Sequence, residues 1–427
     1  MTLIKGQLVS FTDEAVVHHE TGAVVIDAAG RIQFAGNVGQ LSPSDKLLPC
    51  HDYGAKLLMP GFIDPHIHFP QYRMLAAPGV DLLDWLRRFT FPEESRYGDA
   101  AHAEAAAEIF LDRLLSHGTT AALAFCSVHR TSADALFAAA EKRGMALATG
   151  KTLMDRNAIP DVQDDPESAA RDSKWLYRKW HDKGRLRHVV SPRFAITSSD
   201  AQLKVAGELL QELKGSLMQT HLSESPGEIA MVKQLFPGAI DYTDVYDQVG
   251  LLGPRSLFAH GIHLSERECM RLSESGSSIV HCPTSNLFLG SGLMNMAKLR
   301  QATRPVNLGL ATDIGGGTSY SMLRTMGEAY KVQMLLGYKP SATELFRMST
   351  RGNAKRLHLQ DGIGSIEAGK FADLIVLDPQ ATPELAARHD LSESLEDMLF
   401  ALMMLGDERA VAATYVAGQK MFGAEIS

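Results

Sequence analysis

Residues 59–72 read MPGFIDPHIHFPQY, an apolar run that ends in two histidines one residue apart. Side chains alternate between the two faces of a β-strand, so His66 and His68 point the same way as they leave such a strand. Taken alone, such a pair is as often two ordinary interior or surface histidines as two ligands. Its meaning depends on whether the rest of the chain supplies further polar residues at the ends of strands.

From residue 57 onward, short β-rich runs alternate with segments of helical period. This pattern is typical of βα units around a parallel sheet. Eight repeats of this kind in about 300 residues predict a (β/α)8 TIM-like barrel, with a doubly wound open sheet as the alternative. The strand candidates start at Leu57, Thr119, Met145, Leu186, Ser216, Ser256, Ser277 and Val306. The helices are expected at 101–116, 131–143, 166–182, 200–213, 226–235, 265–275, 292–301 and 319–336.

The two flanks of this region differ from it in character. Residues 1–56 and 364–427 have the pattern of short strands joined by turns. Because the two ends of a barrel chain can lie near each other, we expect both flanks to join into one small composite β-domain, a β-sandwich. The α/β catalytic barrel would then comprise residues 57–363.

Composition and charge exclude several classes of protein. The chain of 427 residues is 45% hydrophobic and 22% charged, as in ordinary soluble globular proteins. Its net charge of −8 provides no basic surface for nucleic acid or an anionic membrane. Four scattered cysteines fit a reducing compartment. The apolar run Met398–Leu405 is far shorter than the roughly 20 residues of a membrane helix. We therefore expect a cytoplasmic protein.

Three more polar residues fall at the ends of strand candidates. His221 ends the fifth candidate, His260 the sixth and Asp313 the eighth. The carboxyl ends of barrel strands form the active-site face, so these side chains should meet His66 and His68 there. Imidazoles and a carboxylate are the ligands that Zn²⁺ or Fe²⁺ prefer. Independent polar residues at strand ends would explain any one position but not all of them together, so the pattern predicts a catalytic metal site.

Glu224 lies three residues beyond His221, in the sequence HLSESPGEI. Ser225, Pro226 and Glu228 have the pattern of an N-cap, a first-turn proline and a capping-box partner. Glu224 is then free to face the metal, where a carboxylate could take a proton from water and pass it to a substrate. The alternative is an acid that simply favours the start of a helix.

The fourth strand candidate ends in SPRF, which places a guanidinium beside an aromatic ring. Arg193 and Phe194 together suit a flat heterocycle with carbonyl oxygens, although Arg193 could equally form a salt bridge at the rim. Gln71 offers an amide donor and acceptor, as recognition of a purine edge requires, or is an ordinary loop glutamine. His263 and His281 also lie near strand ends, and we interpret them as structural.

Several segments, in order along essentially the full chain, resemble the guanine deaminase family of the amidohydrolase superfamily. They are PGFIDPHIHFPQY, DLLDWLRRFTFPEE, SPRF, THLSE, HCPTSNLFLGSGL and TDIGGGTSYSML. The resemblance implies a hydrolase, commonly a homodimer, that uses one zinc ion to convert guanine to xanthine and ammonia. Fe²⁺ is the alternative metal.

The resemblance also implies roles for individual residues. Zinc would be bound by His66, His68, His221 and Asp313. Glu224 would be the proton shuttle, with His260 and Asp313 beside the reactive water. Substrate would be bound by Gln71, Arg193 and Phe194, with His68 and Glu224 also beside it.

Other features qualify this resemblance. The segment Leu82–Glu94 corresponds to a long loop that helps to cover the pocket, and Phe69 and Pro70 replace smaller residues of some relatives. The fourth strand ends in Pro192 and Arg193, where relatives with two metals carry a lysine, which favours one metal. Two alternatives stay open: another deaminase of the superfamily that acts on a modified guanine, isoguanine, cytosine or a triazine, and a non-catalytic barrel used as a binding scaffold.

Overall fold

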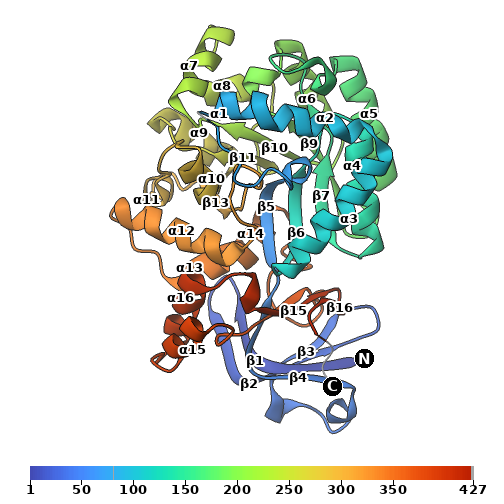
Figure 1. Ribbon diagram of the computed structural model, residues 1–427, viewed down its shortest axis with the longest axis vertical. Coiled ribbons are helices and arrows are strands. Elements are labelled where there is room, and N and C mark those ends of the chain that lie inside the picture. The colour runs from blue at the N-terminus through green and yellow to red at the C-terminus, as the bar shows by residue number, and fades with distance from the viewer. Residues whose placement is uncertain (80, 425–427) are drawn as a thin grey trace.

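The computed structural model describes residues 1–79 and 81–424, and within them eight parallel strands form a nearly closed barrel (Figure 1). Each strand pairs with its neighbour in the sequence, an order that excludes the doubly wound sheet, in which the strand order reverses. The predicted TIM-like barrel is therefore confirmed. Its strands are β5 (Phe62–His68), β6 (Thr119–Phe125), β7 (Ala146–Gly150), β9 (Leu186–Pro192), β10 (Leu217–Leu222), β11 (Ser256–His260), β12 (Ser278–His281) and β13 (Asn307–Leu310).

Helices surround the barrel, and most lie where the sequence predicts them. They include α3 (Ala100–Ser116), α4 (Arg130–Lys142), α5 (Pro166–Trp180), α6 (Asp200–Glu212), α7 (Pro226–Leu235), α9 (Glu266–Ser275) and α12 (Met322–Leu335). The helix expected at 292–301 is wrong in length, because only α11 (Met296–Leu299) forms there. Gly290 and Gly292 have φ values of 69° and 134°, which no α-helix accommodates, and the helical turn α10 (Pro283–Phe288) precedes them instead.

Apolar side chains fill the barrel interior, and polar side chains occupy its carboxyl-terminal mouth. Ile63, Leu123, Val189, Leu257 and Val280 point inward from five different strands and are buried together. Alternation along each strand produces this arrangement, since every second residue faces the axis. The packed apolar interior therefore lies directly beneath the polar residues of the mouth.

One side chain joins the first and last strands of the barrel. Asn353, in the short helix α14 (Asn353–Arg356), donates to the carbonyl oxygens of Ile63 at 2.7 Å and Leu310 at 2.8 Å. Its own amide oxygen accepts from the backbone N–H of Leu310 at 3.2 Å. Asn353 is fully buried, so these backbone groups depend on it for their hydrogen bonds.

Among the described residues of both chain ends, seven strands form a second sheet, which Figure 1 shows below the barrel. Their order is β16 (Gln419–Phe422), β15 (Val411–Val416), β14 (Leu374–Leu377), β4 (Cys50–Pro60), β1 (Thr2–Phe11), β2 (Val16–Ile26) and β3 (Ile32–Asn37). The strand expected to start at Leu57 is thus divided: residues 57–60 belong to β4, and the barrel strand begins at Phe62. A Cβ on Gly61 would lie 2.1 Å from Oγ1 of Thr120, so only glycine fits at this junction. We propose that Gly61 marks the boundary between the two domains.

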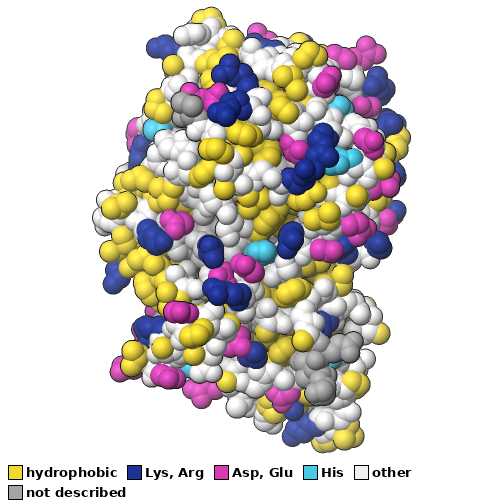
Figure 2. Space-filling model, in the orientation of Figure 1, with side chains coloured by type: hydrophobic (Ala, Val, Ile, Leu, Met, Phe, Trp, Pro, Cys, Tyr) yellow, Lys and Arg dark blue, Asp and Glu magenta, His cyan; other side chains and the backbone are white. Residues whose placement is uncertain are grey.

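The C-terminal flank also contains helices that the sequence reading missed. The expectation of strands and turns alone for residues 364–427 is wrong, because α15 (Pro383–His389) and α16 (Leu395–Leu405) lie between β14 and β15. Helix α16 contains the apolar run Met398–Leu405 and buries Leu399 and Leu402 in the main core. Within the described part of the chain, no helix has both the length and the apolarity to cross a membrane. Figure 2 shows acidic and basic side chains interspersed over the visible face.

Candidate metal centre and active site

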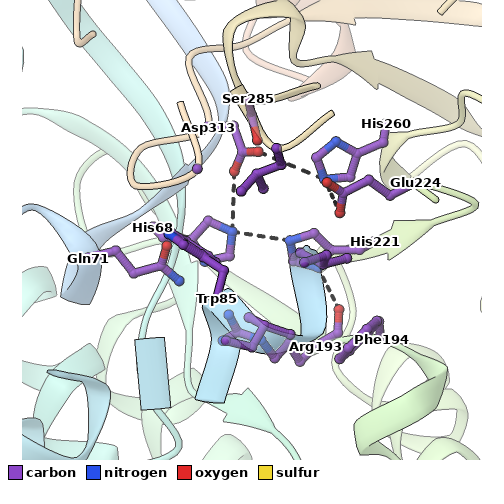
Figure 3. Close-up of a pocket in the computed structure, with 14 residues that line it drawn as sticks. His68, Gln71, Trp85, Arg193, Phe194, His221, Glu224, His260, Ser285 and Asp313 are labelled. Carbon is purple, nitrogen blue, oxygen red and sulfur yellow. Dashed lines mark hydrogen bonds and ion pairs between the residues drawn. The ribbon is translucent and has the colours of Figure 1, made fainter. Parts of the chain in front are cut away.

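The predicted ligands converge at the carboxyl-terminal mouth of the barrel. His66 and His68 lie at the end of β5, His221 is the penultimate residue of β10, and Asp313 follows β13. Figure 3 shows His68, His221 and Asp313 together. Their four ligand atoms all lie within 4.8 Å of one another, and all four residues are buried. Oδ1 of Asp313 lies 3.2 Å from Nε2 of His66 and 3.4 Å from Nε2 of His68. This is a cluster of nitrogen and oxygen ligands that could hold one divalent metal ion.

The protonation of these groups also suits a cation. Burial, together with the neighbouring imidazole of His66, holds the pKa of both His68 and His221 well below the usual value, so their imidazoles are neutral. Burial acts to raise the pKa of Asp313, but the imidazoles, led by His66, outweigh it and lower that pKa to about 2. Neutral imidazoles and an ionised carboxylate are the forms in which these groups bind metals.

A hydrogen bond orients the free lone pair of His221 toward the centre of the cluster. Nδ1 of His221 lies 2.7 Å from the carbonyl oxygen of Arg193, which can only accept, so Nδ1 carries the proton and Nε2 the lone pair. Nε2 of His221 lies 3.1 Å from Nε2 of His68. Nε2 of His66 is buried and makes no hydrogen bond to the described residues, although Oδ1 of Asp313 lies 3.2 Å from it. A metal ion among these nitrogens would satisfy all of them.

Glu224 and His260 stand beside this cluster. Oε2 of Glu224 lies 3.4 Å from Nε2 of His260, which is itself 3.8 Å from Oδ2 of Asp313. Ser291 donates to Oε1 of Glu224 at 2.8 Å, and Nδ1 of His260 lies 2.8 Å from Oδ1 of Asn286. The carboxylate is therefore held in place and faces the pocket, as Figure 3 shows.

The backbone around these residues adopts an uncommon conformation. His260 and Asp313 have φ values of 70° and 54°, in the left-handed region that non-glycine residues seldom occupy. Such positions concentrate at functional sites, where the surrounding structure offsets their cost. Both residues leave the ends of strands at these angles, which turn their side chains into the pocket.

The start of α7 has the predicted capping box. Ser225 is its N-cap, Pro226 its first residue, and Glu228 bonds back to the cap. Oε2 of Glu228 also accepts from the backbone N–H of Glu224 at 2.7 Å, while the hydroxyl of Tyr242 donates to Oε1 at 2.7 Å. Burial and the carboxylate of Glu224 raise the pKa of Glu228 to about 7. Glu228 thus fixes the backbone of Glu224, which leaves the Glu224 side chain free for the pocket.

The predicted substrate residues line the same cavity. Figure 3 shows Gln71 and Arg193 on the side of this pocket away from Glu224 and His260, with Phe194 beside Arg193. The other lining residues are His68, Leu82, Trp85, Leu86, His221, Ser285, Leu289, Asp313 and Gly316.

The segment expected to be a long loop over the pocket is instead helical. It contains α1 (Leu82–Trp85), a π-helical turn (Leu86–Thr90) and α2 (Phe91–Ser95). Leu82, Trp85 and Leu86 line the pocket. The side chain of Asp81 caps α1 by accepting a hydrogen bond from the backbone N–H of Asp84. An aspartate just before an apolar helical run could have indicated this cap from the sequence.

His263 and His281 lie outside the metal cluster, as interpreted from the sequence, and so does Lys151. Nε2 of His263 bonds to the carbonyl oxygen of Ser291 at 2.8 Å, and His281 is buried, which lowers its pKa to about 3. Lys151, after β7, pairs with Asp164 at 2.7 Å.

Sequence reasoning missed Ser291 and Asn286, which hold Glu224 and His260. It also assigned no role to Glu94, which binds Gln71 and Arg193. The quoted segment HCPTSNLFLGSGL contains both Asn286 and Ser291, so its polar residues were the available signal.

Comparison with known proteins gives consistent results over the whole chain. A guanine deaminase of Escherichia coli (strain K12) is 49% identical over 371 residues, which cover 87% of this chain and 84% of that protein. The solved structure of E. coli guanine deaminase superposes with a TM-score of 0.95 at 43% identity and covers 100% of both chains. That of guanine deaminase from C. acetobutylicum, with bound guanine in the active site, gives 0.90 at 28% identity, over 99% of this chain and 100% of that one. The model of the amidohydrolase family matches residues 57–421, so this chain, with its barrel and its histidine and aspartate cluster, belongs to the amidohydrolase family.

Proposed function

We propose that this chain is a metal-dependent hydrolase that deaminates guanine to xanthine and ammonia. One observation carries the proposal: a buried metal-ligand cluster with Glu224 beside it opens into a pocket lined by Gln71, Arg193 and Phe194. The relatives named guanine deaminase support the choice of base.

In this proposal His66, His68, His221 and Asp313 hold one Zn²⁺ ion, with Fe²⁺ as the alternative. The buried lone pairs of the imidazoles and the ionised carboxylate fit either ion. When bound, such a metal lowers the pKa of a coordinated water from 15.7 toward about 7.

The remaining steps fall to side chains of the chain itself. Oε2 of Glu224 accepts a proton from the attacking water and delivers it to the ring nitrogen next to C2 of guanine. That water is oriented by His260, which lies 3.4 Å from Glu224, and by Asp313, which lies 3.8 Å from His260. The oxygen of that water bonds to C2, the proton of the new hydroxyl passes through Glu224 to the amine, and cleavage of the C–N bond releases ammonia and leaves the carbonyl group of xanthine. Well-positioned groups of this kind can remove about 7–11 kcal/mol from a barrier at the extreme.

Substrate orientation would rest on the opposite side of the pocket. The guanidinium of Arg193 donates to a carbonyl oxygen of the base, the amide of Gln71 meets its edge, and Phe194 contacts its face. His68 and Glu224 border the base on the metal side. Leu82, Trp85 and Leu86 exclude water from above, which strengthens each polar contact.

Initial rates of ammonia release from guanine, isoguanine, cytosine and an aminotriazine test this proposal. The purified protein would be loaded with zinc, and its metal content measured by elemental analysis. We expect guanine to give the highest kcat/KM. Faster turnover of a competitor would assign the site to that base, and no release from any base would favour a binding scaffold.

A homodimer and a cytoplasmic location are proposed from the family resemblance and the composition. Sedimentation of the purified protein measures the first, and fractionation of cells that produce it measures the second.

A further inference from the structure

The carboxylate of Glu94, in α2, joins two of the side chains placed at the substrate. Its Oε1 accepts from Nε2 of Gln71 at 2.9 Å, and its two oxygens accept from Nη1 of Arg193 at 2.8 and 2.9 Å. Glu94 has no exposed surface. Among the described residues, those lining the pocket include Gln71 and Arg193 but not Glu94, so it acts on the pocket through these two.

Glu94 fixes the orientation of the side-chain amide of Gln71. Oε1 of Gln71 accepts from the backbone N–H of Gly315 at 3.1 Å, while its Nε2 donates to Glu94. A backbone N–H can only donate and an ionised carboxylate can only accept. The amide therefore cannot flip without losing both bonds, and it presents one fixed donor and acceptor pattern to the pocket.

Glu94 also offsets the charge of Arg193, whose side chain is 4% exposed. A buried guanidinium without a counter-charge would attract an anionic ligand. When it is paired with a carboxylate, it keeps its N–H donors but presents little net charge. An anionic base then loses its hydration when it enters the pocket and meets no net positive charge on Arg193 to compensate. A neutral base with carbonyl oxygens can still accept hydrogen bonds from the N–H groups of Arg193.

We propose that Glu94 is a positioning residue that makes the pocket select neutral heterocyclic bases over anionic ones. It does so by fixing the amide of Gln71 and by neutralising Arg193. The inference rests on the proposed function for the identity of the neutral base, guanine. The anionic counterpart is an oxopurine such as urate.

The test is the variant Glu94→Gln, which keeps the shape of the side chain and removes its charge. Two variants are matched controls. Asp373→Asn breaks another buried pair, in which Nη1 of Arg185 donates to both carboxylate oxygens at 2.8 Å. Glu93→Gln makes the same change on the neighbouring residue of α2, whose carboxylate pairs with Arg96 at 3.1 Å. Calorimetry with the zinc-loaded proteins measures the affinity for urate, steady-state kinetics measure KM and kcat for guanine, with KM as its apparent affinity, and calorimetry measures guanine affinity in any protein that releases no ammonia.

We expect Glu94→Gln to raise KM for guanine about 10- to 100-fold, with a smaller change in kcat, because hydrogen bonds to charged groups that orient the base are lost. Urate should bind more tightly in the same variant, while both controls keep the original ratio of urate to guanine affinity. An unchanged ratio in Glu94→Gln, or the same change in Asp373→Asn, would overturn the proposal.

Glu94→Asp decides the question if the glutamine variant folds poorly. It keeps the counter-charge of Arg193 but shortens the reach toward Gln71, so guanine should bind more weakly without any gain for urate. A gain in urate affinity would contradict the charge argument. Absence of ammonia release by the unaltered enzyme would refute the proposed function, yet the affinity ratios would still decide the role of Glu94.

Discussion

Replacement of Glu224 by glutamine separates proton transfer from metal binding. Among the described residues, two groups could hold an ion: His66, His68, His221 and Asp313, and the smaller set of His260, Cys282 and Asp313; Glu224 belongs to neither. A glutamine oxygen can still accept the hydrogen bond from Ser291, so the side chain should keep its place. The variant thus loses a group that carries protons and keeps the ligands.

The expected loss of activity follows from the enclosure of the site. Proton transfer by a positioned side chain contributes about 10²- to 10⁴-fold to a rate. Glu224 is 2% exposed, so bulk water has little access to replace it. We expect kcat to fall about 1000-fold, which corresponds to about 4 kcal/mol in the activation barrier.

Ammonia release from guanine measures kcat, and elemental analysis of the same sample measures bound metal. Glu268→Gln is the matched control, since Glu268 is a buried carboxylate that caps α9 with Ser265. The control should retain activity within about tenfold. Metal loss in proportion to activity, or more than one tenth of the original kcat in Glu224→Gln, would refute the assignment of the proton shuttle.

Three further predictions concern the metal, the junction between the first and last barrel strands, and the dependence of stability on pH. Removal of metal by a chelator, or the change His221→Ala, should abolish ammonia release, and Zn²⁺ should restore it only in the unaltered chain; activity without bound metal would contradict this. Asn353→Ala removes three hydrogen bonds to Ile63 and Leu310, which join the first and last strands of the barrel. It should lower the free energy of unfolding by about 3 kcal/mol and Tm by a few degrees. An unchanged Tm would show that the junction of these two strands does not depend on Asn353. Because the pKa of Glu228 is raised to about 7, the folded chain retains a proton that the unfolded chain releases near pH 4.5, and stability falls as pH rises between these values. The Tm of Glu228→Gln relative to the unaltered chain should therefore rise from pH 5 to 7.5, and a constant difference would disprove the raised pKa.

Hydrophobic periodicity and strand ends predicted the barrel and its metal cluster well. His221 and His260 are recognisable because β-rich runs lead directly into them. Glu94 and Glu93 are adjacent and chemically identical, and only the orientation of α2 buries one fully and leaves the other partly exposed. The run Met398–Leu405 is apolar throughout, so its pattern alone does not distinguish a buried helix from a buried strand. Tertiary packing decides such cases, and the sequence carries too little local signal for them.

The central position of β4 has a consequence for biosynthesis. One edge of β4 pairs with β1, which leaves the ribosome early, but the other pairs with β14, some three hundred residues later. Until Leu374–Leu377 emerge, the nascent chain must carry an unsatisfied strand edge while the intervening barrel is translated. Such an edge invites pairing with other chains. Production of the enzyme should therefore depend on chaperones that shield this edge, even if the finished molecule is stable.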